Sequence, residues 1–300
     1  MITLLIFILI LGILVLVHEF GHFIVAKKSG LTVEEFGFGF PPRIFSFKVN
    51  ETVYSINLLP LGGFVKILGE DGGETNSPKS FSSKSAGIRS LITAAGVMMN
   101  FALGALLLII GFYIGLPQVV NEENKAIAKN VQIQIIAISN NSPAEKANLK
   151  LGDSIEGFGE ISIFQDFINQ NKEKEISLKI KRGEDYLDIK AVPRANPPER
   201  EGALGIALAK TGLISYPWYQ SVWLGIKSSF IITWEIIKGF FGLIKNLITV
   251  GKIPQEIAGP VGIAILAGQA TALGFVYLLQ LVALISLNLD RKSTRLNSSH

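Results

Sequence analysis

The feature that most constrains this chain is a polar cluster at the end of an uninterrupted apolar segment. Residues 1–17 contain no charged side chain, and His18-Glu19-Phe20-Gly21-His22 follows directly. On a helix the two histidines lie one turn apart on the same face, so both imidazoles can reach one metal ion. Glu19 is placed to accept a proton from a metal-bound water, as in the H-E-x-x-H zinc-protease pattern. The segment therefore predicts a zinc site within a helix that spans a membrane.

The alternative interpretation is a signal peptide or anchor that ends in a polar cluster by chance. A signal peptide has a basic first segment and a small-residue cleavage site, and this N-terminus has neither. Two of the three histidines of the chain lie in the motif. Ionisable groups within an apolar span are costly and functional by default. We therefore favour the metal site.

Composition supports an α-helical polytopic membrane protein. The chain has 300 residues, of which 49% are hydrophobic, and its mean hydropathy is +0.42. This apolarity is concentrated in blocks, as expected for membrane spans of ~20 residues. The net charge of +4 requires no nucleic-acid partner, and the absence of cysteine excludes disulfides and thiol catalysis. We expect about four transmembrane helices, at Ile2–Ala26, Leu91–Leu116, Trp218–Leu243 and the shorter Leu273–Leu289.

Basic residues near the ends of the spans predict the orientation of the chain. They place the first loop and the third-to-fourth connection in the cytoplasm, with the N-terminus and the long middle segment outside. At a rise of about 1.5 Å per residue, His18 lies roughly 25 Å along the first helix, near the cytoplasmic edge of the bilayer core. The basic residues are Lys27, Lys28, Lys84, Arg89, Lys245 and Lys252.

The segment after the first span predicts β structure at membrane depth. Ile44–Phe47 and Thr52–Asn57 alternate in part around a turn at Asn50, which is typical of a β-hairpin. The glycine-interrupted run Leu59–Ile67 follows. Its edge is either a surface that holds an unwound substrate by strand addition or the edge of an ordinarily packed hairpin.

Asn100 lies in the second span, after small residues that permit close helix approach. Its side chain either stabilises helix packing by a hydrogen bond to a neighbouring helix or acts near the metal site.

The middle of the chain is an ordinary soluble domain. Val131–Ile138 is an expected strand, followed by a short helix that Ser142 caps and Pro143 begins. Ile176–Lys181 and Tyr186–Val192 are expected to form a hairpin. Residues 195–201 are proline-rich and are expected to begin a linker. In the third span, Glu235 is expected to pair with a lysine one turn along.

Several motifs together resemble the site-2 protease family, in particular the bacterial intramembrane zinc metalloproteases of the regulator-of-sigma-E-protease type. HEFGH ends the first span, and GFGF-PP with YSINLLPLGGFVK is similar to the membrane-associated β-loop of that family. The stretch Gly96–Phe101 and the segment Gly259-Pro260-Val261-Gly262 occur in the family's order. Ser142-Pro143-Ala144 with Gly152-Asp153 resembles an inserted PDZ domain of the bacterial protease type. The resemblance covers residues 1–289.

The resemblance implies a chain of five parts. These are a membrane core at 1–117, a PDZ-like α+β domain at 118–195, a linker at 196–217, a second membrane core at 218–289 and a tail at 290–300. It implies that His18 and His22 hold Zn²⁺ and that Glu19 is the catalytic base. Gly62, Gly63, Phe64 and Asn100 are candidates for substrate binding.

One departure concerns the third zinc ligand. In the family this ligand is an aspartate of a Leu-Asp-Gly motif in the last span, and this chain has no such motif. We expect residues 290–300 to be foreign or frameshifted sequence on a truncated gene. Asp290 lies too early and lacks the following glycine, and His300 lies at a terminus, so neither is favoured as a ligand. A catalytic zinc normally has three protein ligands, and a chain with two is expected to bind zinc weakly.

The leading functional hypothesis is a zinc-dependent endopeptidase acting in regulated intramembrane proteolysis. It would be a multi-pass protein of the bacterial cytoplasmic membrane that cleaves single-span membrane proteins such as anti-sigma factors. Its PDZ-like domain would lie outside the cytoplasm and bind peptide C-termini or act as a steric gate. The alternative is a non-catalytic membrane scaffold whose PDZ-like domain binds peptides. A transporter is disfavoured because the sequence shows no inverted repeat.

Overall fold

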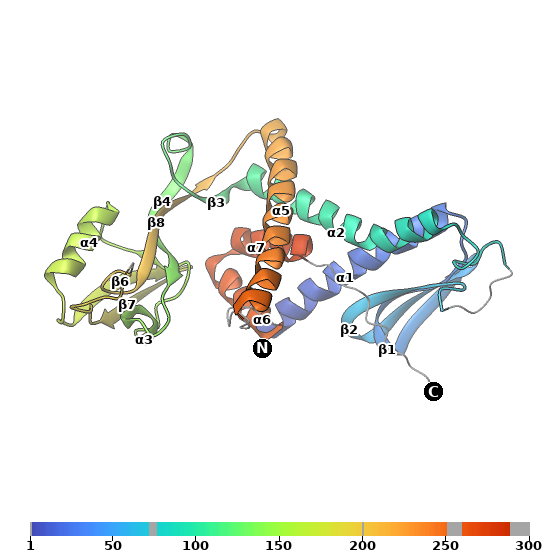
Figure 1. Ribbon diagram of the computed structural model, residues 1–300, viewed down its shortest axis with the longest axis horizontal. Helices are drawn as coiled ribbons and strands as arrows, with labels where there is room; N and C mark the ends of the chain where they lie inside the picture. The colour runs from blue at the N-terminus through green and yellow to red at the C-terminus, as the bar shows by residue number, and fades with distance from the viewer. Residues whose placement is uncertain (1, 72–76, 200, 251–259, 289–300) are drawn as a thin grey trace. The chain divides into compact units, whose positions relative to one another are not determined.

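The computed structural model describes residues 2–71, 77–199, 201–250 and 260–288 (Figure 1). These residues form two compact units. The first unit comprises Met1–Ile109, Val222–Gly268 and Leu281–His300, and the second comprises Ile110–Ser221 and Gln269–Gln280. Each unit is considered by itself.

The first unit is built on long helices and one β-hairpin. Two helices, α1 and α2, have the length and apolarity of membrane spans. Many of their large apolar side chains are exposed, including Leu5, Leu9, Met98 and Leu106, which suits helices that face lipid. The helices are α1 (Ile2–Lys28), α2 (Ala86–Ile114), α5 (Trp218–Val250), α6 (Pro260–Leu273) and α7 (Phe275–Asn288), of which α2, α5, α6 and α7 each extend partly into the second unit.

The third and fourth expected spans differ from the first two in apolarity and in length. The third lies in α5, a 33-residue helix that carries Lys227, Glu235, Lys238 and Lys245 and is therefore less apolar than α1 or α2. Glu235 pairs with Lys238 at 2.7 Å, as expected. The fourth lies in α7, a helix of 14 residues, which is shorter than the ~20 residues that cross a bilayer core. Four transmembrane helices therefore remain a prediction.

The expected β-hairpin is present and is longer than the sequence indicated. Strand β1 (Val33–Val49) pairs antiparallel with β2 (Thr52–Ile67), and Asn50 in the turn has a φ of 53°. Phe36 pairs with Tyr54 on one side and with Val65 on the other, so the first part of β1 lies between the two ends of β2. The segment Gly63–Ile67 is therefore an edge of this sheet.

A small apolar core joins α1, the hairpin and the start of α2. Its five buried residues come from all three elements, which fixes the hairpin against the end of α1. They are Ala26, Leu31, Val33, Ile67 and Ile92.

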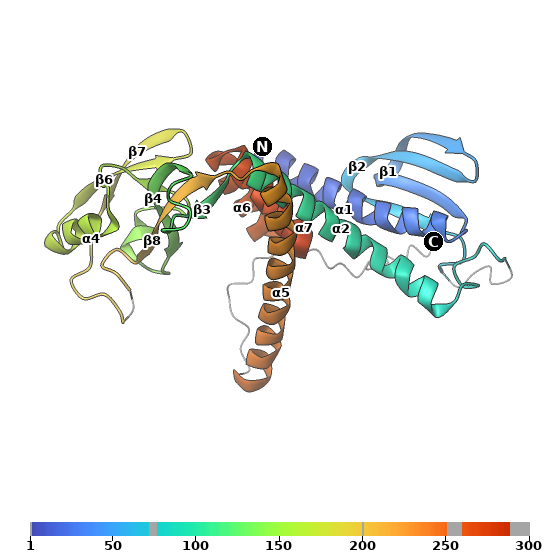
Figure 2. The same ribbon diagram turned by 90° about the horizontal axis from the view of Figure 1, so that it is seen from above.

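The second unit is a six-stranded antiparallel sheet with two short helices (Figure 2). The strand order is β3-β8-β4-β5-β6-β7. A core of buried apolar residues includes Ile135, Phe164, Leu178 and Ile180. The elements are β3 (Leu116–Val119), β4 (Ala128–Ile138), α3 (Pro143–Lys146), β5 (Ser154–Ile155), α4 (Ile161–Gln170), β6 (Ile176–Arg182), β7 (Asp185–Ala191) and β8 (Ile206–Ile214).

Most local expectations for this unit are confirmed, and one is not. The Ser142 side chain caps α3 by accepting from the N–H of Glu145, and Pro143 begins that helix. Strands β6 and β7 form the expected hairpin. The expected linker over 196–217, however, contains β8, which pairs with β3 on one side and β4 on the other. Both pairings are long-range, so the local sequence around Pro197 and Pro198 gave no sign of them. The other domain boundaries remain predictions.

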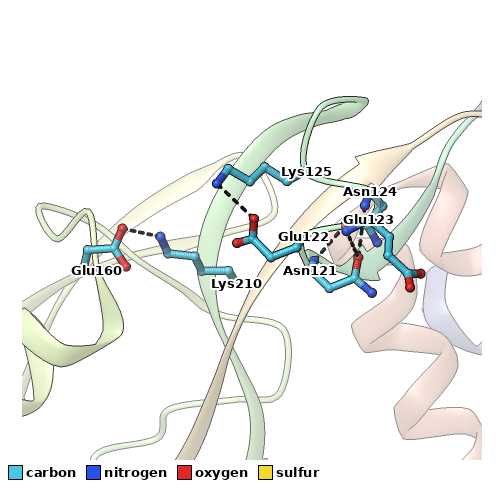
Figure 3. Close-up of polar contacts among 7 residues, drawn as sticks. All are labelled: Asn121, Glu122, Glu123, Asn124, Lys125, Glu160 and Lys210. Carbon is cyan, nitrogen blue, oxygen red and sulfur yellow. Dashed lines mark hydrogen bonds and ion pairs between the residues drawn. The ribbon is translucent and has the colours of Figure 1, made fainter.

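Polar contacts organise the loops near β8 (Figure 3). The Asn121 Oδ1 accepts hydrogen bonds from the N–H groups of Glu123 and Asn124, which closes the turn after β3. Lys210 on β8 forms an ion pair with Glu160, the residue that precedes α4. This pair ties the middle of β8 to the start of the helix.

A buried ion pair stabilises the second unit. The side chain of Asp153 is fully buried, and both of its oxygens accept from Arg182, from Nε and from Nη2, at 2.7 Å each. Arg182 also donates to the Asn148 carbonyl. The Asp153 carboxylate raises the pKa of the Arg182 guanidinium above its ordinary value, so the arginine stays charged.

Replacing Arg182 with leucine should lower the free energy of unfolding of this unit by about 3 kcal/mol, because a buried carboxylate then loses its partner. Hydrogen–deuterium exchange of β5 and β6 in the full chain measures this loss. Lys190→Leu is the control, since its ion pair with Glu175 is exposed and contributes little to stability. Equal effects of the two changes would contradict the prediction.

Candidate metal centre

Helix α1 places the two histidines of the motif side by side. Their ring centroids are 4.9 Å apart, with an angle of 76° between the ring planes. His18 is 6% exposed. The one-turn spacing that the sequence predicted is therefore realised within a single uninterrupted helix.

Helix α2 leaves space directly in front of both rings. A Cβ atom on Gly96 would lie 2.5 Å from Nε2 of His22 and 2.6 Å from Nε2 of His18. The two Nε2 atoms therefore face the same residue of α2, and any side chain at this position would clash with both rings. Imidazole nitrogens bind Zn²⁺ at about 2.0–2.1 Å, so the residues present suit an ion of this kind.

The gap exists because α1 and α2 approach each other closely at small residues. A Cβ on Gly21 would lie 2.4 Å from the carbonyl oxygen of Ala95 and 2.9 Å from Cβ of Met99. A glycine on each helix thus brings the two backbones together at the level of the histidines.

The Nδ1 atoms of the two rings are held by α2. Nδ1 of His22 lies 2.6 Å from the carbonyl oxygen of Ile92. Because a carbonyl can only accept, this Nδ1 carries the hydrogen and the lone pair of the neutral ring is on Nε2. Nδ1 of His18 lies 3.3 Å from Nδ2 of Asn100. The structure therefore places Asn100 against His18.

Glu19 lies where α1 meets the edge strand of the hairpin. Its side chain is partly buried, and it is hydrogen-bonded to the backbone of Val65 on β2. The carboxylate and the two imidazoles are thus neighbours on one helix, and the strand edge is within reach of the same group.

The predicted substrate-binding residues of the hairpin lie against α1 before the histidines. A Cβ on Gly62 would lie 3.2 Å from Cγ1 of Val15, and one on Gly63 would lie 3.7 Å from Cα of Leu16. The ring of Phe64 covers Gly37 within the sheet. Gly62, Gly63 and Phe64 therefore form the part of β2 that packs beside the motif, and their role in substrate binding remains a prediction.

Sequence reasoning did not assign a role to Gly96, Ile92 or Val65. Gly96 was visible as part of a run of small residues, which indicated close helix packing. Ile92 and Val65 act through backbone atoms, for which a sequence carries no direct signal.

In the described part of the chain, no group of three or more histidine, cysteine or acidic side chains could hold a metal ion. Asp290 and His300 lie outside the described residues, as does the whole expected tail.

Comparison with known proteins gives a consistent result. The model of peptidase family M50 matches residues 6–290. The "Putative zinc metalloprotease CPE1693" of Clostridium perfringens is 34% identical over 283 residues, which are 92% of this chain and 78% of that protein. The "Zinc metalloprotease RasP" of Oceanobacillus iheyensis is 29% identical and covers 96% of this chain and 85% of its own length. The "Regulator of sigma-W protease RasP" of Bacillus subtilis is 27% identical and covers 96% and 84%.

Gly96→Ala should weaken zinc binding by about tenfold or more, because the added methyl would clash with both Nε2 atoms and displace the two rings. Gly87→Ala is the matched control, since a Cβ at Gly87 on the same helix meets nothing within 4 Å. Competition of the purified full chain with a chromophoric chelator measures both affinities. An unchanged affinity in the Gly96 variant would show that zinc does not bind at this point.

Proposed function

Because the chain belongs to peptidase family M50, we propose that it is a zinc-dependent intramembrane endopeptidase. Its substrates would be single-span membrane proteins, cleaved within their transmembrane segments. The proposal rests above all on the convergence of the His18 and His22 Nε2 atoms in front of Gly96, with Glu19 on the same helix. The metalloprotease names of its relatives agree with this assignment.

In the proposed mechanism, each of these residues has a separate role in peptide hydrolysis. His18 and His22 would hold Zn²⁺ through Nε2, and the Ile92 carbonyl keeps the His22 ring in the required tautomer. Bound zinc supplies Lewis-acid activation of water and of the scissile carbonyl. Glu19 accepts a proton as general base and later donates it to the leaving nitrogen as general acid.

A further donor is required by the three-ligand pattern of catalytic zinc sites. The aspartate implied by the site-2 protease resemblance remains a prediction. Within the described chain, α7 ends at Asn288, and the residues that follow lie outside the described part.

The hairpin is proposed to hold the substrate in an extended form. Helical carbonyls are hydrogen-bonded and shielded, so a transmembrane helix must unwind before hydrolysis. An edge strand can bind such a segment by strand addition, and Gly63–Ile67 is an edge beside Glu19. The hairpin exposes large apolar side chains away from its Asn50 turn, including Ile44, Phe45 and Leu58, as suits a segment that enters the bilayer.

We place the protein in the bacterial cytoplasmic membrane as a multi-pass protein, oriented by the positive-inside rule. The second unit, a PDZ-like domain in this proposal, would then lie outside the cytoplasm. The regulatory role would be regulated intramembrane proteolysis, with anti-sigma factors as one class of substrate. The relative named as a regulator of sigma-W protease is consistent with that role.

One observation also favours peptide binding by the second unit. Strand β3 pairs with β8 only over Thr211–Ile214, and Val120 donates to the Lys210 carbonyl. On that same side, Ile206–Ala209 have no strand partner among the described residues. Because an open strand edge binds extended peptides, a scaffold with a peptide-binding domain is the second candidate function.

Glu19→Gln separates the two candidates. The change should lower cleavage of a membrane-anchored test substrate by about 100-fold or more, with zinc content unchanged because no ligand is lost. Glu235→Gln is the control, since its side chain is exposed on α5. The assay follows substrate cleavage by the full chain in proteoliposomes. Full cleavage by the Glu19 variant would rule out the proposed chemistry, whereas a wild-type chain that binds peptides but cleaves nothing would favour the scaffold.

A further inference from the structure

Asn100 is a buried polar residue in which the side-chain nitrogen has a hydrogen-bond partner and, among the described residues, the side-chain oxygen has none. It is 1% exposed on α2, in a helix that is apolar over most of its length. Its Nδ2 lies 3.3 Å from Nδ1 of His18. Its Oδ1 is fully buried and has no hydrogen-bond partner among the described residues. An unsatisfied buried acceptor is destabilising, so the position calls for an explanation.

The chemistry of imidazole supplies one. If Nδ2 donates to Nδ1 of His18, the hydrogen of the neutral ring is on Nε2, and this nitrogen cannot bind a metal ion. The two ends of an amide have nearly the same shape, so the group can turn by half a rotation. The Oδ1 atom then accepts from Nδ1–H, which gives the buried oxygen a partner and places the lone pair of His18 on Nε2.

The rotated amide makes His18 equivalent to His22. Nδ1 of His22 donates to the Ile92 carbonyl, and Nδ1 of His18 would donate to the Asn100 carbonyl oxygen. Both acceptors come from α2, two turns apart. Both rings would then carry an unprotonated Nε2 on the side that faces Gly96.

Helix α7 fixes the turn of α2 that carries Asn100. The Oγ of Ser286 donates to the backbone carbonyl of Asn100 at 2.7 Å, in a buried contact. One turn further along α2, a Cβ on Gly104 would lie 2.7 Å from Cγ of Leu287. The glycine therefore allows α7 to come close enough for Ser286 to reach the backbone of α2.

We infer that Asn100 is a positioning residue, which orients the His18 ring and selects its metal-binding tautomer, and that Ser286 holds Asn100 in place. This inference rests on the proposed zinc site. It replaces the substrate-binding role that the sequence suggested for Asn100, because the structure directs the side chain to a ligand of the metal.

The experiment measures the zinc affinity of the purified full chain, by chelator competition, and the visible spectrum of the Co²⁺-substituted protein. Asn100→Leu keeps the side-chain volume and removes the hydrogen bond. It should weaken zinc binding about 10- to 100-fold and shift the Co²⁺ spectrum. Asn100→Asp keeps an oxygen acceptor for Nδ1–H and should retain at least about one third of the wild-type zinc affinity. Asn246→Leu makes the same change at an exposed position on α5 and should have no effect.

The Asp variant distinguishes positioning from packing. A merely structural asparagine would tolerate leucine better than a buried carboxylate, so an equal or greater loss in Asn100→Asp overturns the inference. Unchanged zinc affinity in Asn100→Leu overturns it as well. A separate control compares wild type with His22→Ala. If this change does not reduce zinc binding, the proposed metal site itself is wrong, and that result differs from both outcomes for the Asn100 variants.

A second pair of variants tests the contribution of α7. Ser286→Ala should weaken zinc binding about threefold or more, since the hydrogen bond that holds the Asn100 backbone is lost. Ser229→Ala is the control, because this buried serine donates to the Gly225 carbonyl of its own helix. Equal affinities of the two variants would remove Ser286 from the proposal.

Discussion

The close approach of α1 and α2 is the contact on which the rest of the first unit depends. Gly21 lets the backbone of α1 meet Ala95, and Gly96 leaves room for two converging imidazoles. The same approach brings the Ile92 carbonyl and Asn100 to the Nδ1 atoms. A larger side chain at either glycine would push the two helices apart and move the histidine rings away from Ile92 and Asn100. In the proposed site, metal binding therefore depends on the packing of α1 against α2.

The sequence predicted the elements of the site better than its contacts. His18, Glu19 and His22 were identified because a helical period and a chemical pattern coincided in one short segment. The β-hairpin and the cap of α3 followed from local turn chemistry at Asn50 and Ser142. The backbone partners Ile92 and Val65 could not be predicted, since every residue has the same backbone groups. Strand β8 was missed because its partners lie 68 to 98 residues earlier in the chain, from Ile138↔Ile206 to Leu116↔Ile214.

The hairpin brings the proposed substrate edge next to Glu19, the proposed general base. Gly62 and Gly63 pack on α1 just before His18, and the backbone of Val65 is hydrogen-bonded to Glu19. A segment held at this edge would lie parallel to the helix that carries the motif. The position of the strand thus limits which peptide bond of an extended substrate could come near the base.

The pairing of β8 sets a length for any strand added to it. Lys210 directs its carbonyl to the β3 side, and strand residues alternate, so Leu208 and Ile206 present their backbone groups to the same side. Strand β3 already occupies Thr211–Ile214. An added peptide could therefore pair with β8 over about four residues, or roughly 13 Å of extended chain, before it reaches β3. The edge is therefore closed at its β3 end, where an added strand would have to end or turn away.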